Sequence, residues 1–276
     1  MSTAQTILLG AVAGFTIYLG LPLGRMKTTS VKVKTFLSGI SAGVLIFLLV
    51  EILEHAFVPV ETALEHAHEG EATWGRFAGM ASVYALGIGV GLISLFYVMR
   101  ALKPKPGIGP GAMAVTEFDE AHHARREALH LAMGIAAAIG LHNFSEGLAI
   151  GQSAHNGDTT LAWLLVIGFA LHNATEGFGI VGPLASGNTT ASWRWLGLAG
   201  LVGGGPTFLG TIVGTSFANE FLSVGFLALA GGAIIYVIGE LLAAGRKLSW
   251  EMTLWGAFAG FIVGAATELI LVLAGA

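Results

Sequence analysis

The chain contains no cysteine and very little charge. None of its 276 residues is Cys, and Asp, Glu, Lys and Arg together make up only 11%. The absence of Cys excludes disulfide bonds, thiolate metal ligands and cysteine nucleophiles. An ordinary soluble domain carries about 25% charged residues, so the low charge argues against that class of protein. The formal net charge of -4 is small, and no basic stripe predicts a nucleic-acid partner.

Most of the chain is instead hydrophobic. Hydrophobic residues make up 54% of it, and several apolar runs approach the ~20 residues that a bilayer core requires. We predict membrane spans at about 5–23, 35–57, 75–99, 128–152, 160–184, 195–216, 222–244 and 252–275. These runs are too long for barrel strands, and backbone groups in lipid must satisfy their own hydrogen bonds. The expected fold class is therefore all-α, a polytopic bundle of eight transmembrane helices forming a single domain over 1–276.

The basic residues predict how these spans are oriented. Of the 13 Lys and Arg residues, all but Arg76 fall in the first, third, fifth and seventh connections. Because cytoplasmic loops are enriched in Lys and Arg, both termini should be extracytoplasmic. The longest connections are an outer one over about 58–74 and a cytoplasmic polar loop over about 100–127. No basic residue precedes Arg25, so the first apolar run lacks the positive start of a cleaved signal peptide and should be retained as a span. The expected location of the protein is a cell (plasma or inner) membrane.

Glycine is abundant, with 41 residues. Many glycines lie four residues apart, in the sets Gly10/Gly14, Gly20/Gly24, Gly87/Gly91, Gly210/Gly214 and Gly256/Gly260/Gly264. Small residues at this spacing allow membrane helices to approach closely. We therefore predict that these glycines serve helix packing and have no chemical role.

One pattern of polar residues occurs twice within the apolar runs. His142-Asn143-Phe144-Ser145-Glu146-Gly147 recurs as His172-Asn173-Ala174-Thr175-Glu176-Gly177. Carboxylates and imidazoles are costly inside a membrane and usually mark an ion pathway or a site. On a helix, the His, Asn and Glu of each motif project within one arc of about 100°. Since only a short connection separates the two spans, they should be antiparallel neighbours whose polar faces meet near mid-membrane.

These converging groups predict a binding site for a metal ion. The predicted ligands are His142, Asn143, Glu146, His172, Asn173 and Glu176. Imidazole with carboxylate and amide oxygen suits Zn²⁺, Fe²⁺, Mn²⁺, Co²⁺ or Cd²⁺, whereas Ca²⁺ and Mg²⁺ prefer oxygen ligands throughout. The charge of two ionised glutamates matches one divalent ion. Each of the two asparagines either ligates the ion or supports packing.

The two motifs resemble the signatures of the ZIP family (zinc- and iron-regulated-transporter-like proteins) of prokaryotic type. The segment from Ala233 to Glu240, which includes Tyr236, is also similar to a family segment. The resemblance implies import of divalent transition metals into the cytoplasm and is compatible with a homodimer. It further implies alternating access, with spans four and five and their neighbours moving against the other helices. No prosthetic group is expected, since the metal is the transported substrate.

The chain departs from the family at a position that bears on the number of ions. Several members carry a Glu-Pro pair in the sixth span that helps to hold a second metal. Here the corresponding sequence is Gly203-Gly204-Gly205-Pro206. Two acidic groups would neutralise two divalent ions poorly, so we predict one metal ion at the site.

Further acidic residues lie on the outer side of the predicted site. Glu51, Glu54 and His55 lie toward the outer end of the second span, and Glu268 lies in the outer half of the eighth. Similar acidic positions line the metal entrance in the family. A negatively charged entrance would raise the local concentration of cations. Alternatively, these acidic residues and His55 are simply solvated at the membrane interface.

One acidic residue lies on the inner side. Glu240, near the cytoplasmic end of the seventh span, either receives the outgoing metal or pairs with Arg246 or Lys247. Weaker candidates for binding released metal are His122, His123 and His130.

Two other functions fit parts of this pattern. An intramembrane metal hydrolase would use a His/Glu-bound metal to activate water. The chain has no His-Glu-x-x-His motif, however, and no carboxylate obviously spare as a base. A proton or cation channel would use His and Glu side chains as a relay. One extended row of such side chains along a pore would fit a relay better than the two convergent motifs of this chain. We therefore favour a transporter without enzymatic activity.

Overall fold

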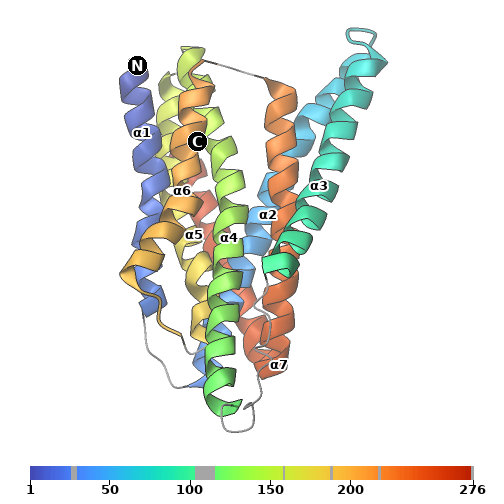
Figure 1. Cartoon of the computed structure of the whole chain (residues 1–276). Coiled ribbons are helices and arrows are strands. Elements are labelled where there is room, and N and C mark those ends of the chain that lie inside the picture. Colours follow the sequence, from blue (N-terminus) through green and yellow to red (C-terminus); the bar gives the residue numbers. More distant parts are fainter. Residues whose placement is uncertain (26–29, 103–115, 158, 187–188, 217–218, 275–276) are drawn as a thin grey trace.

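The computed structural model describes residues 1–25, 30–102, 116–157, 159–186, 189–216 and 219–274, and within these ranges the chain is helical with no strand (Figure 1). The helices are α1 (Thr3–Phe15), the 3-10 turns η1 (Thr16–Leu19) and η2 (Leu21–Arg25), α2 (Val31–His68), α3 (Trp74–Leu102), α4 (Thr116–His155), α5 (Thr159–Ser186), α6 (Trp193–Gly214) and α7 (Glu220–Ala274). The predicted all-α fold class is confirmed.

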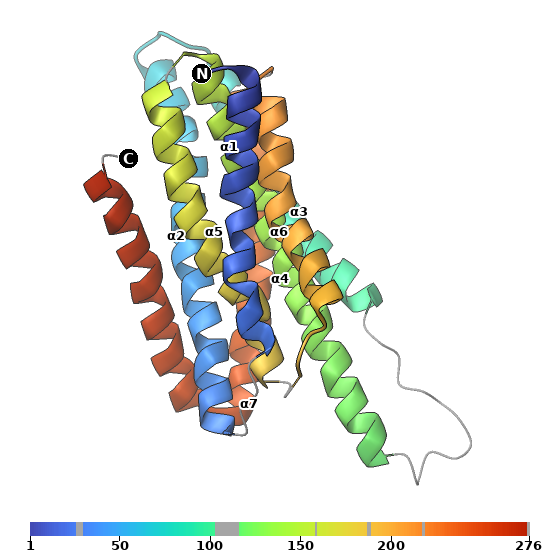
Figure 2. The same ribbon diagram turned by 90° about the vertical axis from the view of Figure 1, so that its left-hand side faces the viewer.

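Within the described ranges, seven helices are long and apolar enough to cross a membrane. The last of them, α7, is divided at Ser249, whose φ of -164° and ψ of 103° are not helical. The two arms of α7 cover the ranges predicted for the seventh and eighth spans, and the second arm lies alongside α2 (Figure 2). The count of eight crossings, the orientation of the termini and the single-domain organisation stay predictions.

Two helices continue far beyond their predicted spans. α2 runs to His68, through part of the stretch predicted as an outer loop, and α4 begins at Thr116, inside the predicted cytoplasmic loop. The predicted connections are therefore helical at 58–68 and 116–127, and the boundaries of the membrane spans stay predictions. With 38 and 40 residues, these helices exceed the ~20 residues that a bilayer core requires. Their polar ends are rich in Glu and Ala, which are strong helix formers in water.

The helices pack in two groups. The first group contains α1, α4, α5 and α6, and the second contains α2, α3 and α7. The groups meet mainly where α5 packs on α2 and where α4 packs on α7. The apolar core spans this junction and includes Leu45 and Leu48 of α2, Ile135 and Ile139 of α4, and Val237 of α7. The first repeated motif lies on α4 and the second on α5, so both belong to the same group.

Close glycine contacts hold each group together, as predicted. A Cβ atom on Gly14 of α1 would overlap the carbonyl oxygen of Gly204 in α6. A Cβ atom on Gly147, directly after the first motif, would overlap the carbonyl oxygen of Thr207 in α6. In the second group, Gly260 of α7 lies against the backbone of Ile40 in α2. The glycines therefore bring helix backbones into direct contact, and α6 fixes the position of the α4 motif.

Gly260→Ala should lower the melting temperature of the purified protein. The new methyl group would meet the Ile40 carbonyl oxygen, and such overpacking typically costs about 1–3 kcal/mol. Gly239→Ala is the matched control, because no atom lies within 4 Å of a Cβ at that position of α7. We expect the control to melt at the wild-type temperature or slightly above it, as measured by scanning fluorimetry in detergent. Equal melting of both variants would contradict the packing role of Gly260.

Candidate metal site

The site is built on the hairpin of α4 and α5. α4 ends at His155 and α5 begins at Thr159, so the two helices are joined by a tight turn. Gly157 in this turn has a φ of 83°, a left-handed conformation that glycine adopts without strain. The turn makes the helices antiparallel and brings two segments that lie 30 residues apart in the sequence to the same depth.

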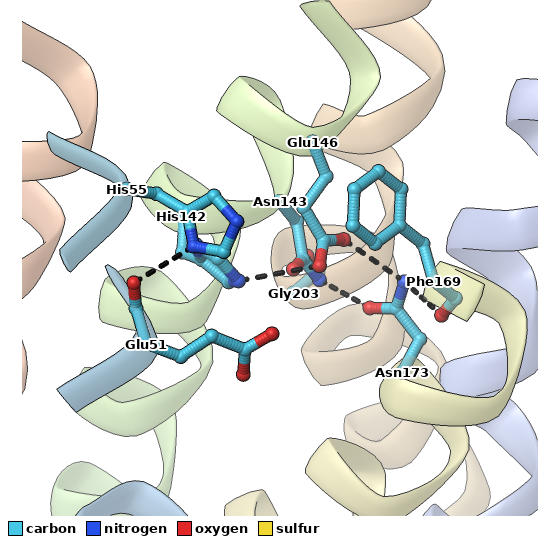
Figure 3. Close-up of polar contacts among 8 residues, drawn as sticks. All are labelled: Glu51, His55, His142, Asn143, Glu146, Phe169, Asn173 and Gly203. Atoms are coloured by element: carbon cyan, nitrogen blue, oxygen red, sulfur yellow. Dashed lines mark hydrogen bonds and ion pairs between the residues drawn. The ribbon is translucent and has the colours of Figure 1, made fainter. Parts of the chain in front are cut away.

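A hydrogen-bond network joins the two motifs (Figure 3). The Asn143 amide nitrogen donates to Oδ1 of Asn173 and, at 3.0 Å, to the Gly203 carbonyl oxygen in α6. The Asn173 amide nitrogen donates to the Phe169 carbonyl oxygen at 2.9 Å and lies 3.4 Å from Oε2 of Glu146. The predicted meeting of the polar faces of α4 and α5 is therefore present in the structure.

The described motif side chains are deeply buried. Asn143, Asn173 and Glu176 have no exposed surface, and Glu146 and His142 are 4% and 7% exposed. Nε2 of His142 lies 3.2 Å from Oε1 of Glu146, one helical turn along α4. The side chain of His172 lies outside the described part of the structure. The structure thus brings together five of the six predicted ligands.

The second carboxylate lies beside the first. Glu176 is close enough to Glu146 and Asn143 to interact with both, and the charge of Glu51 in α2 also acts on it. Two buried carboxylates without a cation between them repel one another, which favours binding of a positive ion. Among the described residues, no three His, Asp or Glu side chains are already arranged around one point as metal ligands.

One oxygen atom of the network is available for an ion. Oδ1 of Asn143 is buried and has no hydrogen-bond partner among the described residues. Buried polar atoms are nearly always satisfied, and a cation would satisfy this one. The sequence did not predict the carbonyl groups of Gly203 and Phe169 as parts of the site. Every residue has a backbone carbonyl group, so a sequence cannot predict which of them will act as acceptors. The run of glycines at 203–205 does indicate a close helix approach.

The family of the chain follows from a comparison with family models. The model of the ZIP zinc transporters matches residues 113–271, which is more than half of the chain and contains both motifs. The chain belongs to the ZIP zinc transporter family. The resemblance noted in the sequence is thereby confirmed. No curated protein sequence matches the chain.

Family membership establishes the broad function of this ZIP protein. ZIP proteins are transporters, and their transported substrates are divalent metal ions. The several apolar helices agree with a multi-pass membrane protein. Transport rather than catalysis is therefore the activity of the family. The formation of a homodimer stays a prediction.

The acidic residues predicted to lie on the outer side differ in how they relate to the site. The carboxylate of Glu51 points from α2 toward the buried network (Figure 3), and its charge interacts with those of Glu268 and Glu146. Glu54 and His55 are exposed, and Nδ1 of His55 lies 2.9 Å from the Glu51 carbonyl oxygen. Of the exposed pair, His55 also lies beside His142 of the first motif (Figure 3).

Glu240, the acidic residue predicted to lie on the inner side, lines a cavity of about 500 Å³. Glu240 is exposed and shares this cavity with His130 of α4 and with Tyr236 and Lys247 of α7. Of the weaker histidine candidates, His130 therefore lies near Glu240. The side chains of His122 and His123 lie outside the described residues.

Proposed function

We propose that this ZIP protein imports one divalent transition-metal ion at a time into the cytoplasm, across a plasma or inner membrane. The proposed substrates are Zn²⁺, Fe²⁺, Mn²⁺, Co²⁺ and Cd²⁺. The proposed site consists of His142, Asn143, Glu146, His172, Asn173 and Glu176. The observation that supports it best is the contact between the two motif copies, through Asn143 and Asn173, in the buried core.

The chemistry of the buried groups favours such an ion. An ion that enters loses water, and the imidazole, amide and carboxylate atoms of the site would replace that water. The two glutamates together supply a charge of -2 when ionised, which neutralises one divalent ion. His172 belongs to the proposal through the sequence repeat alone.

Alternating access is supported by the way the helices are grouped. Glycines pack backbone against backbone within each group, as Gly147 does on α6 and Gly260 on α2. At the junction of the groups the packing is mostly between side chains, and the glycines Gly134 and Gly182 lie against the side chains of Met99 and Ser41. Side-chain interfaces can slide more easily than backbone contacts can separate. We therefore propose that α1, α4, α5 and α6 move together and carry the site past α2, α3 and α7.

Uptake by reconstituted vesicles tests the proposed function. Wild-type protein should accumulate several of the five metals and saturate at micromolar concentration. Glu146→Ala and Glu176→Ala should reduce uptake to the level of protein-free vesicles, because each removes half of the charge that neutralises the ion. Glu251→Ala is the control, since Glu251 is exposed at the start of the second arm of α7.

The other functions give different outcomes in the same vesicles. Uptake that rises linearly with metal concentration would indicate a channel. Metal-dependent hydrolysis of a peptide or ester without uptake would indicate an enzyme. Intact uptake in both glutamate variants would reject the proposed site.

A further inference from the structure

The two asparagines occupy equivalent positions in the sequence repeat, yet their surroundings differ. Both ends of the Asn173 amide have hydrogen-bond partners, since its nitrogen donates to Phe169 and Glu146 while its oxygen accepts from Asn143. The Asn143 nitrogen also donates hydrogen bonds, to Asn173 and Gly203. Oδ1 of Asn143, however, has no hydrogen-bond partner among the described residues. Both side chains are completely buried.

The orientation of each amide is fixed by its neighbours. A peptide carbonyl oxygen can only accept a hydrogen bond. The Gly203 carbonyl lies 3.0 Å from the Asn143 nitrogen, and the Phe169 carbonyl lies 2.9 Å from the Asn173 nitrogen. Rotating either amide by 180° would place oxygen against oxygen. The nitrogen and oxygen assignments therefore follow from the chemistry of the partners and do not depend on a choice between equal alternatives.

These contacts assign different tasks to the two residues. We propose that Asn143 contacts the transported ion through Oδ1, whereas Asn173 holds Asn143 and Glu146 in place without touching the ion. This division of roles rests on the proposed transport site. Asn173 is then a positioning residue, because its oxygen is directed at the Asn143 amide and its nitrogen, which cannot bind a cation, donates to Phe169 and Glu146.

The contact with Glu146 explains why an amide is useful at position 173. The Asn173 nitrogen lies 3.4 Å from Oε2, so it can orient the carboxylate while Oε1 faces His142. Ligands whose orientation is fixed by a surrounding group bind metal more tightly, and removal of such a group typically costs about 10–100-fold in affinity. Asn173→Ala should therefore weaken metal binding without removing a ligand.

A double-mutant cycle separates a positioning residue from a ligand. The dissociation constant of Cd²⁺ is measured by equilibrium dialysis for wild type, Asn143→Ala, Asn173→Ala and the double variant, all in nanodiscs. We expect each single substitution to weaken binding about 10-fold or more. In the Asn143→Ala background, the loss caused by Asn173→Ala should shrink at least about 3-fold, because part of its action passes through Asn143. Losses that multiply fully would identify Asn173 as an independent ligand and overturn the proposal.

An infrared measurement on the metal-free protein provides a test that needs no ion. The carboxyl band of Glu146, whether from the acid or from the carboxylate, is identified as the band lost in Glu146→Gln. Asn173→Ala should shift this band, whereas Asn143→Ala should shift it less. An unshifted band in Asn173→Ala would overturn the positioning role. Should Asn173→Ala fail to fold, Asn173→Ser serves in both experiments, since it also lacks the amide.

The two measurements distinguish failure of this inference from failure of the proposed function. If wild type binds no Cd²⁺, the transport site itself is wrong, while the infrared band still reports whether Asn173 orients Glu146. If wild type binds Cd²⁺ and the two substitutions act independently, the site stands and only the division of roles is wrong.

Discussion

Glu176→Gln and Glu146→Gln should each weaken Cd²⁺ binding by at least about 100-fold. Both carboxylates are almost completely buried, and Glu176 interacts with Glu146. Removing one of them keeps the shape of the site but leaves one positive charge of the ion without a counter-charge. An uncompensated buried charge costs about 3–5 kcal/mol, and each 1.4 kcal/mol corresponds to a tenfold change in affinity. Equilibrium dialysis on protein in nanodiscs measures the effect.

The controls for this prediction concern charge and folding. Glu251→Gln removes the same charge from an exposed position and should leave the affinity within about twofold of wild type. The melting temperature of each metal-free variant shows whether the fold is intact. A loss below tenfold in either buried variant would mean that the ion is neutralised by other groups.

The same titration gives the number of ions bound per chain. We expect one Cd²⁺ at saturation, because the two buried carboxylates supply only two negative charges. The position that carries an acidic residue in several ZIP proteins lies in the run Gly203-Gly204-Gly205-Pro206 of α6. In the structure, Gly203 contributes only a carbonyl oxygen, which accepts from Asn143. Two tightly bound ions would contradict the charge argument.

The sequence predicted the elements of the site because its signals are local. Helical spacing places His142, Asn143 and Glu146 on one face of α4, and the short turn at Gly157 makes α5 antiparallel. These two facts are sufficient to predict that the motifs meet. The hydrogen bond between Asn143 and Asn173 agrees with that expectation.

The ends of the helices could not be predicted in the same way. Apolar run length measures the part of a helix inside the bilayer and not the helix itself. α2 continues to His68 and α4 begins at Thr116, since their polar ends are stable as helices in water. A sequence reading based on hydropathy therefore ends α2 about three turns too early and begins α4 about three turns too late.

The sequence also could not predict the unequal roles of the two asparagines. The repeat presents Asn143 and Asn173 as equivalent. Their difference comes from partners on other turns and other helices, namely the carbonyl groups of Gly203 and Phe169. The first depends on how closely α6 approaches α4, which is a property of the packed bundle.

Crosslinking α4 to α7 should abolish uptake while leaving metal binding intact. The rings of Phe144 in α4 and Phe226 in α7 lie 4.7 Å apart, at the junction between the two helix groups. If the groups slide past one another during transport, a covalent bridge at this point would hold them in one state. The chain has no native Cys, so Phe144→Cys and Phe226→Cys would provide the only thiols for a short bifunctional reagent.

A second pair of aromatic residues supplies the matched control. The rings of Phe47 in α2 and Phe261 in α7 lie 5.6 Å apart and belong to the same group. After treatment, the Phe144/Phe226 pair should transport no faster than protein-free vesicles, and the Phe47/Phe261 pair should keep at least half of its untreated rate. The untreated double variants show the effect of the substitutions themselves. Undiminished uptake in the fully crosslinked first pair would mean that α4 and α7 stay together throughout transport, and the site would then have to open to each side by local movements within α4 and α5.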